Sequence, residues 1–422
     1  MSIESINPSP RGLRRGVSSR WSRWAAVAGP GVVVMLADTD AGSIITAAQS
    51  GAQWGYGLLA LQLVLIPVLF VVQELTVRLG IVTGKGHGRG IQEHFGRGWA
   101  WLSVSTLLVA CVGALITELS GIAGVGSLAG IPPWESMVVV VVGLTAMAFT
   151  GSYLAVERIA LAVGLFEAVF LVVAWMAHPD PAQMVADTVG THWGDSKLLY
   201  LVAANIGAVI MPWMVFYQQS AVVEKGLTLD DLRAARWDTA IGAVITQLVM
   251  AAVLVATAAT LGRAHSGQSL DTVQQIAQAL GAYLGPRAGR TMFALGMIGA
   301  ALVATIVVTL TAARSLGEIL GFRHSLEHHP REAPWFYGVY VLTLVLGAVL
   351  VSSGIDLVRL SVGVQVMNAL LLPIVLTFLF LLARRALPEP YRLKGRFAWV
   401  AAGVIAVSAG LGLYAGIAGV VG

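Results

Sequence analysis

Apolar segments long enough to cross a lipid bilayer recur along almost the whole chain, and this pattern excludes most other architectures. A transmembrane helix needs about 20 predominantly apolar residues. Of the 422 residues, 57% are hydrophobic and only 11% are charged, whereas about 25% are charged in a typical soluble domain. The sequence therefore predicts an all-α polytopic membrane protein. The predicted spans are eleven in number and cover approximately residues 24–52, 56–79, 100–128, 134–151, 154–177, 197–222, 237–261, 290–318, 334–353, 357–383 and 397–421.

Spans 1 and 6 are predicted to be discontinuous helices. The first contains Asp38-Thr39-Asp40-Ala41-Gly42-Ser43, in which Ala-Gly-Ser is poor at keeping a helix straight. The sixth contains Ile210-Met211-Pro212-Trp213, where the proline removes a backbone donor and clashes with the preceding turn. The two breaks lie five spans apart, and this odd spacing is typical of inverted repeats.

We therefore expect a transporter core at residues 24–385, made of two inverted five-helix repeats at about 24–177 and 197–385. A cytoplasmic N-terminal tail at 1–23 and an additional transmembrane helix at 396–422 complete the predicted organisation.

The distribution of Lys and Arg predicts the orientation in the membrane. With the N-terminus inside, 21 Lys and Arg residues fall in cytoplasmic segments, and four (Lys197, Arg263, Arg287 and Arg290) fall outside. Basic residues accumulate on the cytoplasmic side. We therefore expect a multi-pass protein of the cytoplasmic membrane, with its N-terminus in the cytoplasm and its C-terminus external. The net charge of +4 follows from these loops and implies no nucleic-acid partner; the expected surroundings are the lipid bilayer.

Asp40 is the strongest candidate for a cation ligand. An acid at the centre of a membrane helix costs about 2.5–3.5 kcal/mol on insertion scales, so it indicates an ion path or a binding site. A carboxylate suits hard and borderline divalent ions, and Ser43 offers a hydroxyl nearby. In the sixth span, Met211 offers a thioether for softer metals, and the proline would free the carbonyl of Ala208. Gln365 in the tenth span is either an oxygen ligand or a link between helices.

Three further polar residues lie within apolar spans. Asp38 would point away from Asp40 on a regular helix, so it is a cap, the partner of a distant cation or an ion ligand. Glu118 is either a carboxyl held neutral or paired between helices, or a proton carrier. Asn368 lies less than one turn after Gln365 and would support it or link helices.

These motifs resemble those of the Nramp family of divalent metal transporters, over roughly residues 24–385. Asp40-Ala41-Gly42-Ser43 is similar to the family's Asp-Pro-Gly-Asn, and Met211-Pro212 to its Met-Pro-His-Asn. Gln365, eight residues before a proline, corresponds to a family glutamine. The resemblance implies a LeuT-like fold and alternating access. It also implies that the metal is held by Asp40, Met211, the Ala208 carbonyl and, in some states, Gln365.

The chain departs from the family pattern at three places. Ser43 replaces the metal-binding asparagine, and Trp213 replaces the histidine linked to proton movement. One of two family acids in the third span is kept as Glu118 and the other is lost. Proton coupling is therefore expected to be weak or absent. The residues after Pro212 look more like the divergent branch that includes magnesium transporters, although that branch usually lacks the methionine.

The predicted function is a secondary transporter for divalent metal cations, with Mn²⁺ or a related transition metal favoured. An uncoupled Mg²⁺ transporter is one alternative. Another is an amino-acid or other organic-substrate symporter on the same fold. No nucleophile and base have the spacing of a catalytic pair, so the chain is not expected to be an enzyme. The metal is the substrate, and no cofactor is expected.

Overall fold

The computed structural model describes residues 29–191, 193–262, 269–282, 284–353 and 357–421, and these residues form helices joined by short connections. The predicted tail at 1–23 and the first residues of the first span, 24–28, lie outside this range. Among the described residues, nine helices are long and apolar enough to cross a membrane, and one bent helix pair makes a tenth span. A shorter apolar helix occupies the position of the fourth predicted span.

The helices follow the predicted spans closely. The membrane elements are α2 (Pro30–Asp38) with α3 (Ala41–Trp54), α4 (Leu59–Thr83), α6 (Arg97–Leu128), α7 (Pro133–Ala148), α8 (Tyr153–Gly164) with η1 (Leu165–Ala168) and α9 (Val169–Met176), α11 (Ser196–Val209) with α12 (Pro212–Glu224), α13 (Leu232–Thr257), α15 (Pro286–Leu320), α16 (Pro334–Ser352), α17 (Leu357–Arg385) and α18 (Gly395–Val421). Short helices lie between them: α5 (His87–Phe95), α10 (Pro181–Gly190) and α14 (Val273–Gly281).

Both predicted breaks are confirmed. The axes of α2 and α3 differ by 49°, and the linking Asp40 has an extended backbone, with φ −76° and ψ 173°. Between α11 and α12, Met211 is also extended, with φ −90° and ψ 141°, and Pro212 starts the next helix. Proline is well suited to the first turn of a helix, where its missing N–H would have no helical partner.

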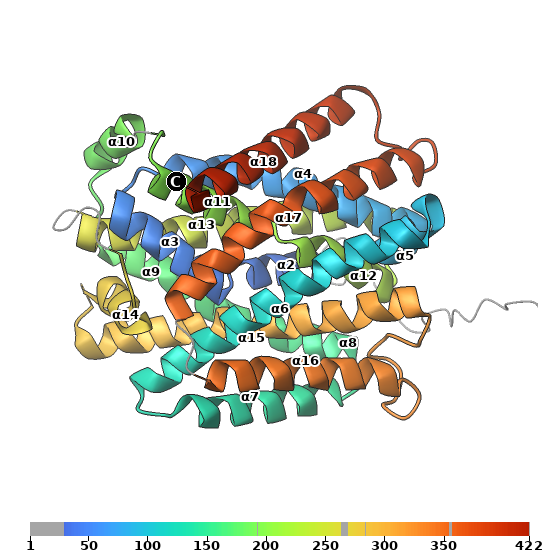
Figure 1. Ribbon diagram of the computed structural model, residues 1–422, viewed down its shortest axis with the longest axis horizontal. Helices are drawn as coiled ribbons and strands as arrows, with labels where there is room; N and C mark the ends of the chain where they lie inside the picture. Colours follow the sequence, from blue (N-terminus) through green and yellow to red (C-terminus); the bar gives the residue numbers. More distant parts are fainter. Residues whose placement is uncertain (1–28, 192, 263–268, 283, 354–356, 422) are drawn as a thin grey trace, which may run out of the picture.

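The broken helices lie inside the bundle (Figure 1). In the most apolar part of the sixth span, 94% of the residues are buried, whereas 28% are buried in α18. The outward faces of α7, α16 and α18 expose large apolar side chains, for example Val139, Val349 and Trp399. Such faces suit lipid tails. The breaks are therefore surrounded by protein, where irregular backbone can be tolerated at membrane depth.

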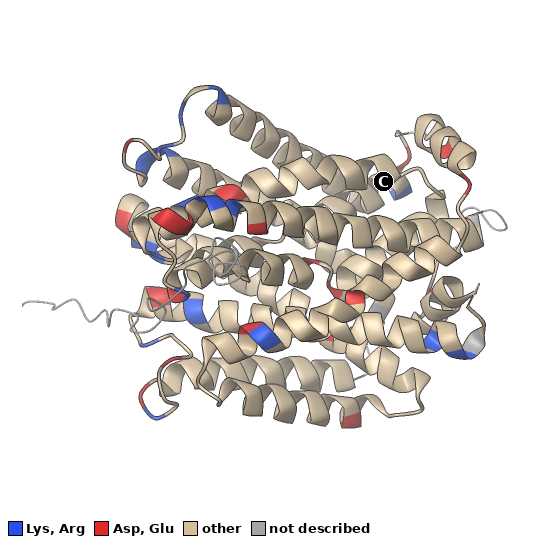
Figure 2. Ribbon diagram, turned by 180° about the vertical axis from the view of Figure 1, so that it is seen from behind, with Lys and Arg blue, Asp and Glu red and all other residues tan. Residues whose placement is uncertain are grey.

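Charge is distributed unevenly along the bundle. Figure 2 shows most Lys and Arg residues at the end that carries the α4–α5, α15–α16 and α17–α18 connections. At the same end, the first turn of α2 is held by a buried acid on α13. The Gly31 amide donates to Asp238 Oδ2 at 2.8 Å, and the Gly29 amide lies 3.3 Å from the same carboxylate. This contact fixes where the first broken helix begins.

Candidate metal-binding site

Asp40 lies at the first helix break and caps α3. The Ser43 amide donates to Asp40 Oδ1 at 2.6 Å, and the residue is fully buried. Its second oxygen, Oδ2, has no hydrogen-bond partner in the described part of the chain. A carboxylate at a helix N-terminus is stabilised by the free N–H groups and the helix dipole. One oxygen of Asp40 thus fixes the side chain, and the other is available to a ligand.

Ser43 joins the two breaks directly. Its hydroxyl donates to the Ala208 carbonyl at 3.1 Å. In a regular helix, this carbonyl would accept from the N–H four residues later, but that position is Pro212, which has none. The serine therefore supplies a donor that the proline removes. Ser43 thus contacts both Asp40, through its amide, and the Ala208 carbonyl, through its hydroxyl.

Met211 and Trp213 flank the proline at the start of α12. Both side chains are fully buried, and the Trp213 indole N–H has no hydrogen-bond partner among the described residues. Met211 precedes the helix and lies three residues after Ala208, whose carbonyl Ser43 contacts. The thioether is thus placed at the same break as the freed carbonyl, and the indole occupies the position where the resemblance implied a histidine.

Gln365 of α17 reaches Asp40 from the other side. Its Nε2 lies 3.4 Å from Asp40 Oδ1, while its Oε1 accepts from Asn368 Nδ2 at 2.9 Å. A Cβ on Gly42 would lie 2.4 Å from the Gln365 nitrogen, so this approach requires glycine there. In this arrangement Gln365 donates to the carboxylate. It would need to turn its amide to present oxygen to a metal.

Gly207 lets α11 and α17 approach closely enough for this arrangement. A Cβ at Gly207 would lie 1.8 Å from the Gln365 carbonyl oxygen and 2.7 Å from the Ala369 nitrogen, both backbone atoms. Small residues commonly allow such contact between membrane helices. The glycine therefore fixes the distance between the broken sixth span and the helix that carries Gln365.

Glu118 of α6 meets the same helix end. Its Oε2 accepts from the Ala41 amide at 3.0 Å, and its Oε1 accepts from the Thr117 hydroxyl at 3.2 Å. The N-terminus of α3 is therefore held by two acids, Asp40 and Glu118. Within the described ranges, no group of three or more His, Cys, Asp or Glu side chains could hold a metal. A metal at this site would thus depend on mixed ligands: carboxylate, carbonyl, hydroxyl and thioether.

Asp38 lies on the far side of the break. It ends α2, and the Thr246 hydroxyl of α13 lies 3.5 Å from its Oδ2. Near it lies Glu167, at the 3₁₀ turn that interrupts the fifth span. Glu167 is not among the site residues predicted from the sequence. The signal was present, since a single acid in an apolar span is the feature that identified Asp40.

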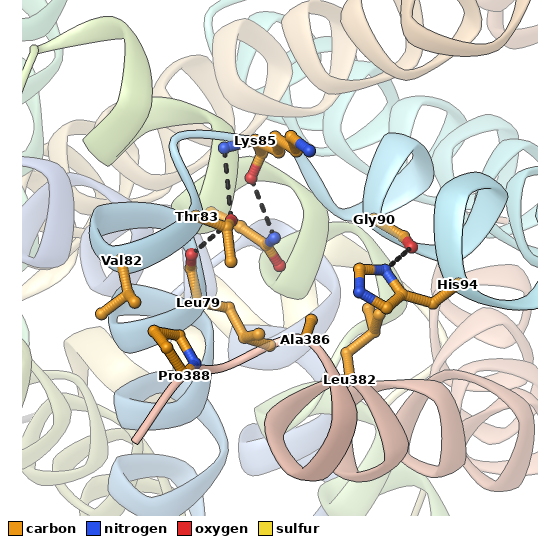
Figure 3. A pocket seen from close by; sticks show the side chains of 10 residues that line it. Leu79, Val82, Thr83, Lys85, Gly90, His94, Leu382, Ala386 and Pro388 are labelled. Atoms are coloured by element: carbon orange, nitrogen blue, oxygen red, sulfur yellow. Dashed lines mark hydrogen bonds between the residues drawn. The ribbon is translucent and has the colours of Figure 1, made fainter. Parts of the chain in front are cut away.

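Two cavities lie near these helices, and neither is lined by Asp40 or Met211. One, of about 230 Å³, lies between α4, α5, α12 and α17; Figure 3 shows His94, Lys85 and Leu382 around it. The other, of about 260 Å³, lies between α2, η1 and α13. Asp40, Ser43 and Met211 are at most 1% exposed. The candidate site is closed in this conformation.

His87 is buried beside the first cavity, outside the membrane spans. Its Nδ1 lies 2.9 Å from Gln219 Oε1, and its ring packs edge-on against Phe216. The Gln219 Nε2 donates to the Lys85 carbonyl, which leaves Oε1 to accept from the imidazole. Burial lowers the pKa of His87 to about 4, although the contact with Gln219 opposes the change. His87 is therefore neutral near pH 7.

We expect acid to destabilise the protein through His87. A histidine with a lowered pKa in the folded state stabilises the fold above its ordinary pKa near 6.5, and this contribution is lost as the pH falls towards 4. The loss could reach about 3 kcal/mol at low pH. Melting temperatures measured from pH 7.5 to 4.5 should fall less steeply for His87→Gln than for the wild type. His94→Gln is the control, and identical pH profiles for all three proteins would contradict the prediction.

The chain is similar to known transporters along most of its length. The family model named Nramp, Natural resistance-associated macrophage protein-like, matches residues 31–418. The divalent metal cation transporter MntH of Klebsiella pneumoniae subsp. pneumoniae is 27% identical over 360 residues, which cover 83% of this chain and 84% of the relative. This relative is a transporter, in agreement with the expectation that the chain is not an enzyme and that metal is a substrate.

Solved structures share the fold. A crystal structure of the Eremococcus coleocola manganese transporter, with an aromatic bis-isothiourea compound, gives a TM-score of 0.75 at 20% identity and covers 100% of this chain and 92% of that chain. MhsT in complex with L-phenylalanine gives 0.60 at 13% identity and covers 97% and 99%. The predicted all-α, LeuT-like fold is confirmed. Because the family model spans nearly the whole described chain, the protein belongs to the Nramp family.

Proposed function

We propose that the protein moves divalent metal cations across the cytoplasmic membrane, with Mn²⁺ or a related transition metal as the preferred substrate. The observation that carries the proposal is the contact between the two helix breaks, in which the Ser43 hydroxyl donates to the Ala208 carbonyl. This contact links the helix break at Asp40 to the helix break at Met211, and both residues are buried. The names of the relatives, which specify divalent metal cations and manganese, support the same substrate class.

The ligand set favours a borderline metal. Asp40 Oδ2 is free of hydrogen bonds within the described residues, and the Ala208 carbonyl offers a second oxygen. Met211 adds a thioether, which suits Mn²⁺, Fe²⁺ or softer ions better than Mg²⁺. Ser43 offers a hydroxyl, and Gln365 becomes an oxygen ligand if its amide turns away from Asn368.

Mg²⁺ is the second candidate substrate. It dehydrates reluctantly and usually keeps several waters, so it needs a wider site. Trp213 and Met211 are fully buried next to the break, and neither described cavity reaches Asp40. Their burial favours an ion that is held directly by protein ligands in this closed conformation. An organic substrate such as an amino acid would need still more room beside the two breaks.

Transport requires the closed site to open on each side in turn. We propose that the half-helices α2 and α12, or α3 and α11, move relative to the surrounding helices. The basic end of the bundle is assigned to the cytoplasm by the distribution of Lys and Arg. We therefore propose that the N-terminus lies in the cytoplasm and the C-terminus outside. Proton coupling is proposed to be weak or absent, because the indole of Trp213 cannot titrate.

The proposal is tested with the purified chain in liposomes, by uptake of Mn²⁺ and Mg²⁺ down equal concentration gradients. Saturable Mn²⁺ uptake that exceeds Mg²⁺ uptake is expected. Simultaneous measurement of internal pH reports proton movement, and little acidification is expected. Uptake of neither ion by a folded, reconstituted protein would refute the proposed function, and equal uptake of both ions would refute the preference.

Met211→Ala should weaken Mn²⁺ binding and leave Mg²⁺ nearly unchanged. We expect a loss of about 10-fold in Mn²⁺ affinity, since the thioether is a good ligand only for the softer ion. Titration calorimetry with each ion measures the two affinities. Met250→Ala is the control, because Met250 is equally buried but lies within the regular helix α13. Equal weakening of both ions in Met211→Ala would show that the side chain contributes packing and not a ligand.

A further inference from the structure

A second polar group lies beside α2, apart from the ligands of the proposed metal site. It joins the last residue of α2, the break residue that follows, the 3₁₀ turn of the fifth span and the middle of α13. We name it the Glu167 cluster, and its members are Asp38, Thr39, Glu167 and Thr246. The Thr39 and Thr246 hydroxyls lie 2.6 Å apart, and Thr246 lies 3.5 Å from the Asp38 carboxylate.

Glu167 is buried, and the Thr39 hydroxyl is a favourable polar neighbour of its carboxyl. It is 1% exposed, and neither of its carboxylate oxygens has a hydrogen-bond partner in the residues that the structure describes. Its carboxyl interacts electrostatically with the Thr39 hydroxyl and with the carboxylates of Asp38 and Asp40. Asp38 is equally buried, and its Oδ1 also has no partner there. Buried polar groups are nearly always satisfied, and a buried charge without a partner is costly.

The position of the cluster favours a cation. Asp38 and Thr39 lie where α2 ends, and the C-terminal end of a helix carries free carbonyls and partial negative charge. Half-helix ends of this kind coordinate Na⁺ in transporters with broken helices. The two hydroxyls and two carboxylates are all hard oxygen donors. The cluster thus combines a negative helix end with unpaired carboxylate oxygens.

The surroundings favour a monovalent ion. The cavity of about 260 Å³ beside the cluster is lined by Glu167, Thr246 and mainly apolar side chains such as Met35, Leu36 and Val249. Mg²⁺ keeps several waters and would need polar space for them. Fe²⁺, Zn²⁺ and Cu²⁺ would gain from nitrogen or sulfur ligands, and the cluster offers oxygen alone.

We propose that the Glu167 cluster binds one Na⁺ ion, at a site separate from the metal site at Asp40. The inference goes beyond the proposed function, because it assigns a second ion to a separate group of side chains. Asp38 ends α2 and Asp40 caps α3, so the two sites lie on opposite sides of one helix break. An ion bound at each site would hold the two half-helices in one relative orientation.

The test measures binding of radioactive sodium to the purified full chain in detergent, in choline buffer at constant pH. The wild type should bind about one Na⁺ per protein. Glu167→Gln, which keeps the shape of the side chain, should weaken binding at least about 10-fold. Thr246→Val should weaken it as well. Thr257→Val is the matched control, because Thr257 is also buried in α13 but donates to carbonyls of its own helix.

Calorimetry with Mn²⁺ on the same samples separates this inference from the proposed function. Asp40→Asn should lose Mn²⁺ binding and keep Na⁺ binding. If the wild type binds Mn²⁺ but shows no saturable Na⁺ binding, the second site is refuted and the proposed function stands. If Na⁺ binds and Mn²⁺ does not, the proposed function fails and the sodium site stands. Unchanged Na⁺ affinity in Glu167→Gln would also refute the site; should that variant fail to fold, Thr246→Val decides.

Discussion

Asp40→Asn should abolish metal transport and leave the fold intact. Asparagine caps a helix about as well as aspartate does, so α3 should keep its N-terminus and its contact with the Ser43 amide. The substitution removes the negative charge of the site's central ligand. We expect the affinity for Mn²⁺ to fall by about 100-fold or more, since a neutral amide is a much weaker ligand for a divalent ion.

The measurements are Mn²⁺ calorimetry, uptake into liposomes and the melting temperature without metal. Asp195→Asn is a matched control, because Asp195 caps α11 in the same way, accepting from the Lys197 amide at 2.8 Å, but lies at the exposed start of the helix. The Asp195→Asn protein should transport Mn²⁺ at the wild-type rate. A folded Asp40→Asn protein that binds Mn²⁺ as tightly as the wild type would place the metal elsewhere.

Gly207→Ala should strongly lower the stability of the protein, because the added methyl group would clash with backbone atoms. The new Cβ would meet the Gln365 backbone carbonyl at 1.8 Å, and a backbone atom cannot rotate away as a side chain can. The helices α11 and α17 would have to separate, which would also withdraw Gln365 from Asp40. We expect a loss of about 3 kcal/mol or more in stability, at the upper end of overpacking effects.

Gly403→Ala on α18 is the control, because a Cβ there would meet no atom within 4 Å. Thermal unfolding in detergent, followed by tryptophan fluorescence, compares the three proteins. The control should melt near the wild-type temperature, and Gly207→Ala should melt well below it or fail to accumulate. A Gly207→Ala protein with unaltered melting and Mn²⁺ affinity would show that α11 and α17 are not in backbone contact at this point.

The sequence predicted the spans and both breaks because their signals are local. Hydrophobic runs locate the helices, and the proline at 212 and the Ala-Gly-Ser after Asp40 locate the interruptions. The spacing of the breaks predicted that they would face each other, and the Ser43–Ala208 contact joins them. The fourth span is shorter than predicted: α7 ends at Ala148, and the chain turns at Gly151, which has φ 65°.

The remaining features depend on contacts between residues far apart in the chain. The Thr39–Thr246 contact joins residues 207 positions apart, and no local pattern marks either threonine. Asn368 sets the direction of the Gln365 amide, because its Nδ2 donates a hydrogen bond to Gln365 Oε1. Sequence spacing places these two amides on one helix but does not determine which atom faces Asp40. Glu167 is an acid within an apolar span, which the sequence shows. Only the structure shows that its two carboxylate oxygens have no hydrogen-bond partner among the described residues.

The short helix α7 has a consequence for the membrane around the protein. Sixteen residues rise about 24 Å along a helix axis, whereas the hydrocarbon core of a typical bilayer is about 30 Å thick. The bilayer next to α7 must therefore become thinner, or side chains that flank the helix must extend to the headgroup layer. The thickness of the bilayer should therefore affect the packing of lipids around α7. Lipids with shorter acyl chains would match this helix with less deformation of the bilayer.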